Sequence, residues 1–517
     1  MKILYFLDYG REYGGAANTL IQQAAILNAS GHDVTAYVSD YLGNEIWDEY
    51  RERIDEADLV VKRLCFFLTS EPEDIDVVNI DEQYDEIKEE IESQQPDIVH
   101  SVQLNPLVEL VCRDLKIPHI MSIYVLSDDF FHVRYLDIFP HYLISDSKCC
   151  AEQWKKHIGV KYACIRTIAK PISRNKKYSA SETRCICVGT IYKGKNQLEV
   201  IKGFHKALSG GFCGTLELYG YAVGPYAEEC KEYIVRNGLD SKIMIRGFGK
   251  NMGDVYDESD VLICGSIRES YPNAVSEAMA HGLVVVSTPV GGVPEIISDG
   301  YNGFLTKGYT ENEIFEKLQE YKEYLRSGMI EDVYQHSLAT AYNEHTPEII
   351  GNKVMDFYKE VISDNKSRDY SPLPSVDDIR ERYNRFISVF KSNEESFSDP
   401  KAVSSKLWYL AYIEKSIDEA AQANRIFYSW GAGKFGKIAI EIMKTFFPDI
   451  RLGGVIDSKA EGDFMGYTVL RPRDVLVSKS SVILVSLGNG QWDVVDSLRQ
   501  YNKTLGKDYY VFAPRTW

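Results

Sequence analysis

The sequence lacks the features of an exported, membrane-spanning or zinc-binding protein. Its ten cysteines all fall between Cys65 and Cys264, and none of them forms a CxxC pair. This pattern fits neither a disulfide framework nor a zinc site. No apolar run approaches the roughly 18 residues of a membrane-spanning helix, and the N-terminal run is too short for a signal peptide. We therefore predict a protein of the reducing cytoplasm, with the inner face of the membrane as an alternative location.

Positive charge is also scarce, because 58 Lys and Arg stand against 76 Asp and Glu, a net charge of −18. This balance opposes sequence-independent binding to nucleic acid. With 44% hydrophobic and 26% charged residues, the composition is that of a globular protein and excludes disorder, collagen or coiled coil as the main architecture. A chain of 517 residues is long enough for three or four domains.

Short apolar runs alternate with helical sequence from Lys2 to about residue 170, and a second such series begins near Arg184. This alternation is typical of parallel, doubly wound sheets. We therefore predict an α/β protein with two Rossmann-like domains facing a cleft, followed by a small third Rossmann-like domain. The predicted boundaries are 1–175, 176–363 with its last helices returning toward the first domain, 364–424 as a linker and helical segment, and 425–517.

The most informative stretch runs from Ser266 to Ile297. Glu269 and Glu277 are separated by seven residues, and Pro272 stands where the first turn of a helix tolerates proline. Free N–H groups at a helix start attract anions, and nearby carboxylates accept hydrogen bonds from sugar hydroxyls. The combination suits a sugar nucleotide. Taken alone, the two glutamates also fit helix capping and surface charge.

This stretch resembles the donor-site signature of the GT-B retaining glycosyltransferases of family 4, whose E-x7-E motif the two glutamates match. The resemblance covers about residues 1–363. It includes the domain order, the N-terminal glycine loop, and the VGG-PE-I and NGFL segments around Gly291 and Asn302. It implies that Glu277 holds the ribose hydroxyls and Glu269 those of the transferred sugar. Backbone at Tyr271, Pro272 and Asn273 would approach the diphosphate and the sugar.

Other positions of the resemblance are kept only in part. Gly14 and Gly15 follow the first strand, where the family lines the cleft, although a plain tight turn is the alternative. After Gly189 the family has an arginine and then a lysine facing the diphosphate, and this chain has Thr190 and Lys195. Lys195 could neutralise charge on the departing diphosphate. Arg268 or Lys193 could replace the missing guanidinium, although both also fit a solvated surface charge.

Two further residues are cleft candidates. Tyr124 stands where the family commonly has a histidine near the transferred sugar, and a phenol cannot titrate near pH 7 as imidazole does. We expect His100 to end a parallel strand, and α/β ligand sites gather at strand ends. A structural histidine inside the fold is the alternative for His100.

The chain has no H-E-x-x-H motif and no DxD motif on a strand followed by turn residues. The resemblance implies that no metal or other cofactor is required. The donor would be a nucleotide-diphosphate sugar. Retention at the anomeric carbon would follow a front-face, oxocarbenium-like transfer, in which the leaving phosphate helps to deprotonate the acceptor hydroxyl. The glutamates would orient the substrate and would not act as the acid/base pair of a hydrolase.

The segment 148–177 carries nine Lys or Arg and one Glu in an otherwise acidic protein, with Trp154 beside two lysines. Such a patch could contact anionic lipid or an acceptor with a lipid pyrophosphate. A basic surface that offsets acidic charge elsewhere is the alternative.

Near the C-terminus, Gly431, Gly433 and Gly436 form a G-x-G-x-x-G motif between a predicted strand and helix. Asp457 follows 21 residues later, where an acidic residue would bind ribose. The region resembles the small Rossmann-like domain at the front of sugar acyltransferases. It would bind a nucleotide or nucleotide sugar, or serve for docking or homo-oligomerisation.

The sequence thus predicts transfer of a hexosyl unit from a nucleotide sugar to a hydroxyl of a glycan, lipid-linked or protein acceptor during bacterial surface glycan synthesis. One alternative is a non-catalytic GT-B scaffold that binds sugar nucleotide, favoured by Thr190 and Tyr124. Another is an NAD-dependent sugar-modifying enzyme, which depends on the C-terminal glycine motif alone.

Overall fold

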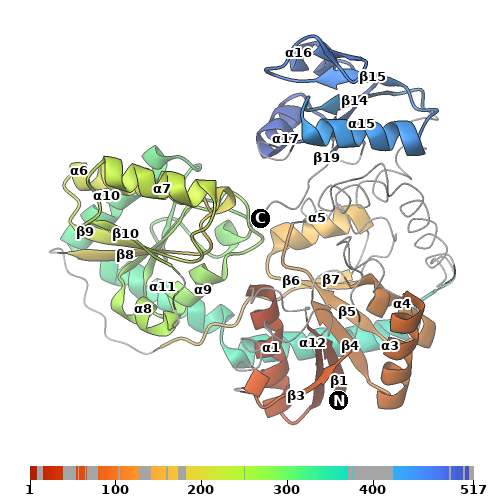
Figure 1. The fold of residues 1–517 in the computed structure, drawn as a ribbon. Helices are drawn as coiled ribbons and strands as arrows, with labels where there is room; N and C mark the ends of the chain where they lie inside the picture. Colours follow the sequence, from red (N-terminus) through yellow and green to blue (C-terminus); the bar gives the residue numbers. More distant parts are fainter. Residues whose placement is uncertain are drawn as a thin grey trace.

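The computed structural model contains three separate sheets, each covered by helices (Figure 1). None of the described helices combines the length and the apolar character needed to cross a membrane. The structure describes residues 1–7, 15–38, 54–55, 57–64, 66, 80–102, 105–126, 141–158, 161–172, 182–247, 249, 251–370, 377, 423–487, 491–504 and 507–511.

The first sheet has seven parallel strands in the order β3-β2-β1-β4-β5-β6-β7. Every residue of its strands β4 and β6 is buried, as expected of strands covered by helices on both faces. The strands are β1 Lys2–Phe6, β2 Asp33–Val38, β3 Val60–Arg63, β4 Ile98–Val102, β5 His119–Ser122, β6 Tyr142–Ser145 and β7 Lys161–Cys164, and the helices are α1 Gly15–Ala29, α3 Ile80–Gln94, α4 Pro106–Leu115 and α5 Lys148–Ile158.

The second sheet has six parallel strands in the order β10-β9-β8-β11-β12-β13. Its strands are β8 Thr183–Val188, β9 Gly214–Tyr219, β10 Ile243–Gly247, β11 Val261–Cys264, β12 Val284–Ser287 and β13 Phe304–Leu305. Its helices are η4 Lys193–Lys195, α6 Gln197–Ser209, α7 Pro225–Arg236, α8 Met252–Glu258, α9 Asn273–Ala280, η5 Val293–Glu295, α10 Glu311–Ser327 and α11 Ile330–Glu344.

Helix α12, Pro347–Asn365, returns from the second sheet to the first (Figure 1). Thr346 caps its start by accepting a hydrogen bond from Ile349 N (3.4 Å), and Pro347 occupies the first turn, where no N–H is needed. Its apolar face packs into the core of the first domain through Ile350, Val354, Phe357, Tyr358 and Val361. The two halves are therefore joined by this helix as well as by the chain between β7 and β8.

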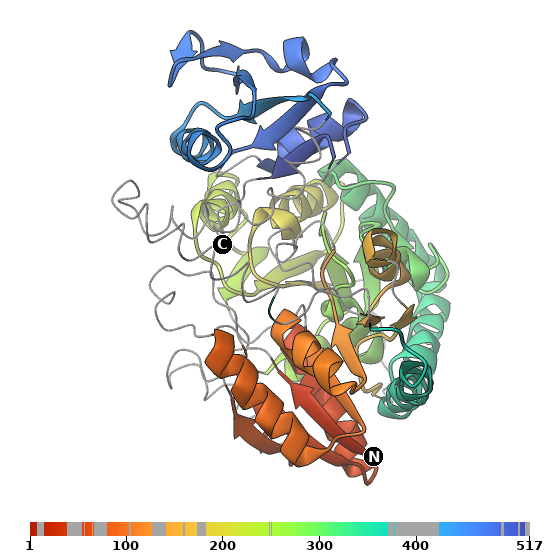
Figure 2. The ribbon, with the colours of Figure 1, turned by 90° about the vertical axis from the view of Figure 1, so that its right-hand side faces the viewer.

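The third sheet has the order β16-β17-β15-β14-β18-β19, and β16 alone among the described strands pairs antiparallel. Both views show it with its helices as a separate body at one end of the molecule, in blue (Figures 1 and 2). Its elements are β14 Ile426–Trp430, α15 Lys434–Phe446, β15 Leu452–Ile456, β16 Asp463–Phe464, β17 Tyr467–Leu470, α16 Pro472–Leu476, β18 Ser481–Val485, α17 Gln491–Gln500 and β19 Tyr509–Val511. The α/β class predicted from the sequence is confirmed, whereas the linker and helical segment predicted at 364–424 lies mostly outside the described residues.

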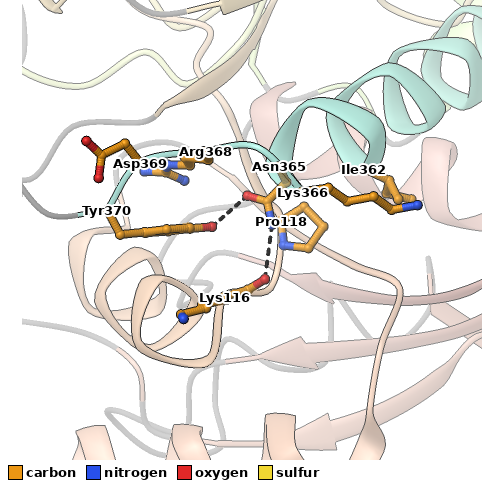
Figure 3. A pocket seen from close by; sticks show the side chains of 8 residues that line it. All are labelled: Lys116, Pro118, Ile362, Asn365, Lys366, Arg368, Asp369 and Tyr370. Atoms are coloured by element: carbon orange, nitrogen blue, oxygen red, sulfur yellow. Dashed lines mark hydrogen bonds between the residues drawn. The ribbon is translucent and has the colours of Figure 1, made fainter.

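A surface hollow of about 600 Å³ lies where the chain leaves α12 (Figure 3). Arg368 lines it and donates to Glu109 (3.3 Å), whose buried carboxylate also pairs with Arg113 and His119. Burial alone would raise the pKa of Glu109, but these three partners lower it to about 2. Because Lys116 and Pro118 of the hollow precede β5, it lies at the amino ends of the strands, away from the edge where α/β ligand sites form.

Candidate functional site

Lys195 and Glu269 come together at the carboxyl edge of the second sheet. Lys195 ends η4, which follows β8, and Glu269 lies in the loop after β11. Their side chains form an ion pair and are 22% and 18% exposed. Burial would lower the pKa of the Lys195 ammonium, but the negative charge and hydrogen bond of Glu269 outweigh it and raise this pKa. Lys195 is therefore charged at neutral pH, and it lies at the same edge of the second sheet as the loop that carries Glu269.

The backbone around Gly189 is shaped to carry the Lys195 side chain. Gly189 has φ +137°, and a Cβ there would lie 3.2 Å from Lys195 Cε. Gln197 fixes this loop by donating to the carbonyl of Thr190 (2.9 Å). Ile267 N donates to the carbonyl of Gly194 (2.9 Å) and so joins the η4 loop to the loop of Glu269.

The positions proposed as substitutes for the missing arginine lie in these same two loops. Thr190 and Lys193 are exposed in the loop after β8, and Arg268 is half-buried directly before Glu269. The structure thus places both candidate cations at the same edge of the second sheet as Lys195. Whether either of them contacts a diphosphate stays a prediction.

Glu277 lies in the second turn of α9 and is held by a tyrosine that the sequence analysis missed. Tyr256 of α8 donates to Glu277 Oε2 (2.6 Å). Burial and the nearby Glu277 charge raise the pKa of Tyr256 well above its usual value, so the phenol stays a donor. Among the described residues Oε1 of Glu277 accepts no hydrogen bond. One oxygen of the carboxylate is thus fixed while the other can accept from a ligand.

The start of α9 faces the first domain. Its N-cap is Pro272, and no side chain caps the helix. Asn273 accepts a hydrogen bond from Thr167 (2.7 Å) and contacts the Gly15 carbonyl at the start of α1 through its Nδ2 (3.5 Å). A Cβ on Gly15 would lie 2.7 Å from this nitrogen. Two helix N-termini, both favourable to anions, therefore meet at Asn273, whereas Gly14 lies outside the described residues.

The Tyr271 side chain points into the protein and away from this opening. It is 3% exposed, its hydroxyl accepts from Ser276 (3.2 Å), and its ring stacks on His345 with centroids 6.2 Å apart. Burial raises its pKa above the usual tyrosine value. Only the backbone of Tyr271 can therefore face a ligand, which is the part of the residue that the sequence analysis proposed.

Gly291 supports the loop of Glu269 from behind. It has φ +49°, and a Cβ there would lie 2.2 Å from the Ser270 carbonyl oxygen and 2.3 Å from that of Glu269.

We expect Gly291→Ala to cost about 1–3 kcal/mol of stability through overpacking. We also expect it to displace Glu269, so that nucleotide affinity falls. Thermal unfolding and nucleotide titration measure the two effects. Gly224→Ala is the matched control, because Gly224 has φ +88° but nothing within 4 Å of its added Cβ. Equal nucleotide affinity in both variants would contradict this role of Gly291.

His100 lies inside the first domain and not in an opening at its edge. Its ring is fully buried, with Nδ1 2.6 Å from Tyr358 Oη and Nε2 2.6 Å from Ser122 Oγ. Burial lowers its pKa to about 3, so it is neutral at physiological pH. His100 lies in the middle of β4 and not at its end, so its placement in the cleft was wrong, and the alternative of a structural histidine fits.

Tyr124 follows β5 and is half-buried against the same core. Its role near the transferred sugar stays a prediction.

In the third domain, Asp457 is already engaged by the glycine loop. Its carboxylate accepts from Ala432 N (2.9 Å) and from Lys459 N and Ala460 N (2.7 and 2.9 Å). Burial would raise the pKa of Asp457, but these backbone N–H groups lower it. Asp457 therefore organises the loop, a role that the ribose-binding prediction did not include.

The three glycines of this loop differ in their surroundings. Gly431 has φ +127°, and a Cβ on Gly436 would lie 1.8 Å from the Gly431 carbonyl oxygen. Gly433 precedes α15 and has nothing within 4 Å of an added Cβ. The first and third glycines are thus required by close packing of the strand, loop and helix, and ligand binding by this loop stays a prediction.

The basic segment 148–177 does not present Trp154 to the outside. The indole is 3% exposed and donates to the Val125 carbonyl (2.9 Å). Lys161 and Arg166 are paired with acidic groups, whereas Lys148, Lys155 and Lys170 are exposed. The tryptophan therefore contributes to the core and not to a lipid-facing surface. Membrane contact by the exposed lysines stays a prediction.

Across the described ranges, no group of three or more His, Cys, Asp or Glu residues is arranged to hold a metal ion. The charged groups that we proposed for the donor site and that lie at the carboxyl edge of the second sheet include Lys193, Lys195, Arg268, Glu269 and Glu277.

Comparison with known proteins adds a family match and a fold. Residues 182–322 match the family model described as glycosyl transferases group 1. The chain is 25% identical to N-acetyl-alpha-D-glucosaminyl L-malate synthase of Bacillus anthracis over 197 residues, 37% of this chain and 50% of that protein. It is 30% identical over 135 residues to the putative colanic acid biosynthesis glycosyltransferase WcaL of Salmonella typhimurium, 23% of this chain and 33% of that protein. The matches thus span half or less of these two relatives.

Among solved structures, Alr3699/HepE of Anabaena in complex with UDP aligns with a TM-score of 0.57 and 16% identity. The alignment covers 70% of this chain and all of that one, and the same protein is also solved with UDP-glucose. At this identity the likeness shows the fold alone. The first two domains have the GT-B architecture that the sequence predicted.

Proposed function

We propose that the protein is a retaining glycosyltransferase that moves a hexosyl unit from a nucleotide-diphosphate sugar to a hydroxyl acceptor. The match of residues 182–322 to glycosyl transferases group 1 and the GT-B architecture support the reaction class. The relative WcaL, named for colanic acid biosynthesis, supports a place in bacterial surface polysaccharide or glycoconjugate synthesis. The fold neighbour solved with UDP and UDP-glucose supports a uridine diphosphate sugar as the first donor to test.

The observation that carries this proposal is the convergence of Lys195, Glu269 and the start of α9 at one edge of the second sheet. Breaking a glycosidic bond to a nucleoside diphosphate leaves new negative charge on the phosphate. A fixed ammonium and a helix N-terminus stabilise such charge without reorganising. Since Lys195 is ion-paired to Glu269, binding of a diphosphate at the ammonium would let the glutamate turn to the sugar hydroxyls.

Glu277 is suited to a different part of the donor. Its carboxylate is held on one oxygen by Tyr256, so the other can accept a pair of vicinal hydroxyls in a fixed direction. Two adjacent ribose hydroxyls provide such a pair. The two glutamates thus orient the ends of the donor, and neither acts as a nucleophile in the proposed reaction.

The function is tested by following release of nucleoside diphosphate from UDP-glucose and other sugar nucleotides in the presence of a panel of hydroxyl acceptors. We expect acceptor-dependent release with one donor and product of unchanged anomeric configuration. Thermal shift identifies the donor first, since a ligand at 100 times its Kd stabilises the folded protein by about 2.7 kcal/mol. A thermal shift without release for any acceptor would favour the non-catalytic scaffold, and an inverted product would reject the retaining mechanism.

A further inference from the structure

The start of α5 in the first domain is capped from the second domain. Within the first domain, Ser147 accepts hydrogen bonds from Cys150 N through its hydroxyl (3.1 Å) and from Ala151 N through its carbonyl (3.1 Å). The two remaining N–H groups of the first turn, those of Lys148 and Cys149, donate to the Glu295 carboxylate (3.0 and 2.8 Å). Because Glu295 belongs to η5 beyond β12, the cap is complete only when the two domains are together.

Charge strengthens this contact beyond an ordinary surface ion pair. Glu295 places a negative charge at the positive end of the α5 dipole and also accepts from the guanidinium of Arg166 (3.1 Å). The Arg166 and Glu295 side chains are 9% and 19% exposed, so solvent screens the charges less than at the surface. Three hydrogen bonds to one carboxylate make this a strong contact between the domains.

A second contact ties the same helix start to the loop of Glu269. Ser270 follows Glu269 directly, and its hydroxyl donates to the buried Asp146 carboxylate and lies 3.1 Å from Ser147 Oγ. Gly292 N donates to the Ser270 carbonyl (2.7 Å), and a Cβ on Gly292 would lie 2.4 Å from Ser147 Cβ. The loop carrying Glu269 and the turn carrying Glu295 therefore both close onto the residues between β6 and α5.

We infer that Glu295 is a positioning residue that clasps the two domains, with Ser270 and Asp146 transmitting the closed arrangement to the neighbouring Glu269. The clasp consists of the Glu295 contacts to the start of α5 and to Arg166, and of the Ser270 contact to Asp146. When it is closed, Glu269 and the start of α9 face the first domain. The clasp rests on the proposed function only in its coupling to nucleotide binding.

The test compares Glu295→Gln with Glu313→Gln in the full-length protein by small-angle scattering. In Glu295→Gln an amide N–H faces backbone N–H groups, and the charge is lost. Glu313 also caps a helix, since it accepts from Thr310 N (3.0 Å) at the start of α10, but this contact lies within one domain. Loss of a partly buried cap charge should shift the balance of closed to open forms roughly tenfold. We expect a larger radius of gyration for Glu295→Gln only.

Adding UDP extends the test to the site. The apparent affinity for a ligand that binds only the closed form falls in proportion to the fraction of the protein that is closed. Glu295→Gln should therefore need more UDP than the unchanged protein, by at most about the tenfold shift in the balance, and at saturating UDP it should regain the scattering profile of the unchanged protein. Ser270→Ala, which removes one hydroxyl, should show the same effect more weakly. It serves as the second variant if Glu295→Gln does not fold.

Three outcomes would overturn the clasp: a Glu295→Gln profile equal to that of Glu313→Gln, an open form that UDP binds without closing, or Ser270→Ala indistinguishable from the unchanged protein. If UDP does not bind the unchanged protein, the nucleotide assignment fails. The ligand-free scattering comparison still decides whether Glu295 holds the domains together.

Discussion

Lys195→Ala should lower turnover about 100- to 1,000-fold, the usual effect of removing one group that stabilises charge developing in a transition state. Donor binding should weaken less, because the helix N-terminus of α9 and Glu277 remain. The variant also leaves the Glu269 carboxylate, which is only 18% exposed, without the Lys195 ammonium that pairs with it. Steady-state kinetics at saturating donor measure the effect on turnover, and titration with the nucleoside diphosphate measures the effect on binding.

Lys202→Ala is the matched control for this variant. Lys202 pairs with Glu199 (2.7 Å) within α6 of the same domain, so it is also an ion-paired lysine. Its loss should leave both turnover and nucleotide affinity unchanged. If Lys195→Ala behaves like Lys202→Ala, the assignment of Lys195 to the diphosphate is wrong. If the unchanged protein and both variants bind nucleotide but none of them shows turnover, the scaffold alternative is favoured.

Glu277→Ala should weaken binding of the nucleotide by about 10- to 100-fold, because hydrogen bonds to a charged group contribute roughly 1.5–3 kcal/mol. The variant also leaves the buried Tyr256 hydroxyl without its acceptor, so some loss of stability accompanies the loss of affinity. Calorimetric titration with UDP, and with the same nucleotide lacking its ribose hydroxyls, measures the effect. The 2′,3′-dideoxy form should bind the unchanged protein about as weakly as UDP binds the variant.

Tyr256→Phe separates the orientation of the Glu277 carboxylate from its presence, and Glu258→Ala is the matched control. Tyr256→Phe keeps the carboxylate but frees it to rotate, so affinity should fall less than in Glu277→Ala. Glu258 pairs with Arg184 at the surface (3.3 Å), and its loss should leave affinity unchanged. Equal affinity in Glu277→Ala and Glu258→Ala would remove Glu277 from the nucleotide site.

The α/β fold class was predictable because it depends on local signals. Continuous apolar runs gave the buried strands, and the proline and threonine that begin α12 are ordinary start signals. Pro272, which marks the first turn of a helix, likewise placed Glu269 before that helix and Glu277 within it, and the structure has both residues there. The return of the last helices toward the first domain was also predicted, and α12 packs there.

Burial was harder to predict than the positions of the elements. His100 and Trp154 were both proposed for exposed roles, and both are fully or almost fully buried. A histidine in the middle of a buried strand looks the same in sequence whether its ring nitrogens meet ligand or protein. The hydrogen-bond partner of His100, Tyr358, is 258 residues away in the sequence, so no local pattern could predict the contact.

The sequence by itself determined the alternation of strands and helices and the spacing of the two glutamates, because these follow from the backbone periods of neighbouring residues. Tertiary structure alone decided that Lys195 pairs with Glu269, that Tyr256 fixes Glu277, and that Glu295 caps α5. Each of these contacts joins residues from different elements. Their distance depends on how whole helices and sheets pack, and that packing is set by many side chains together.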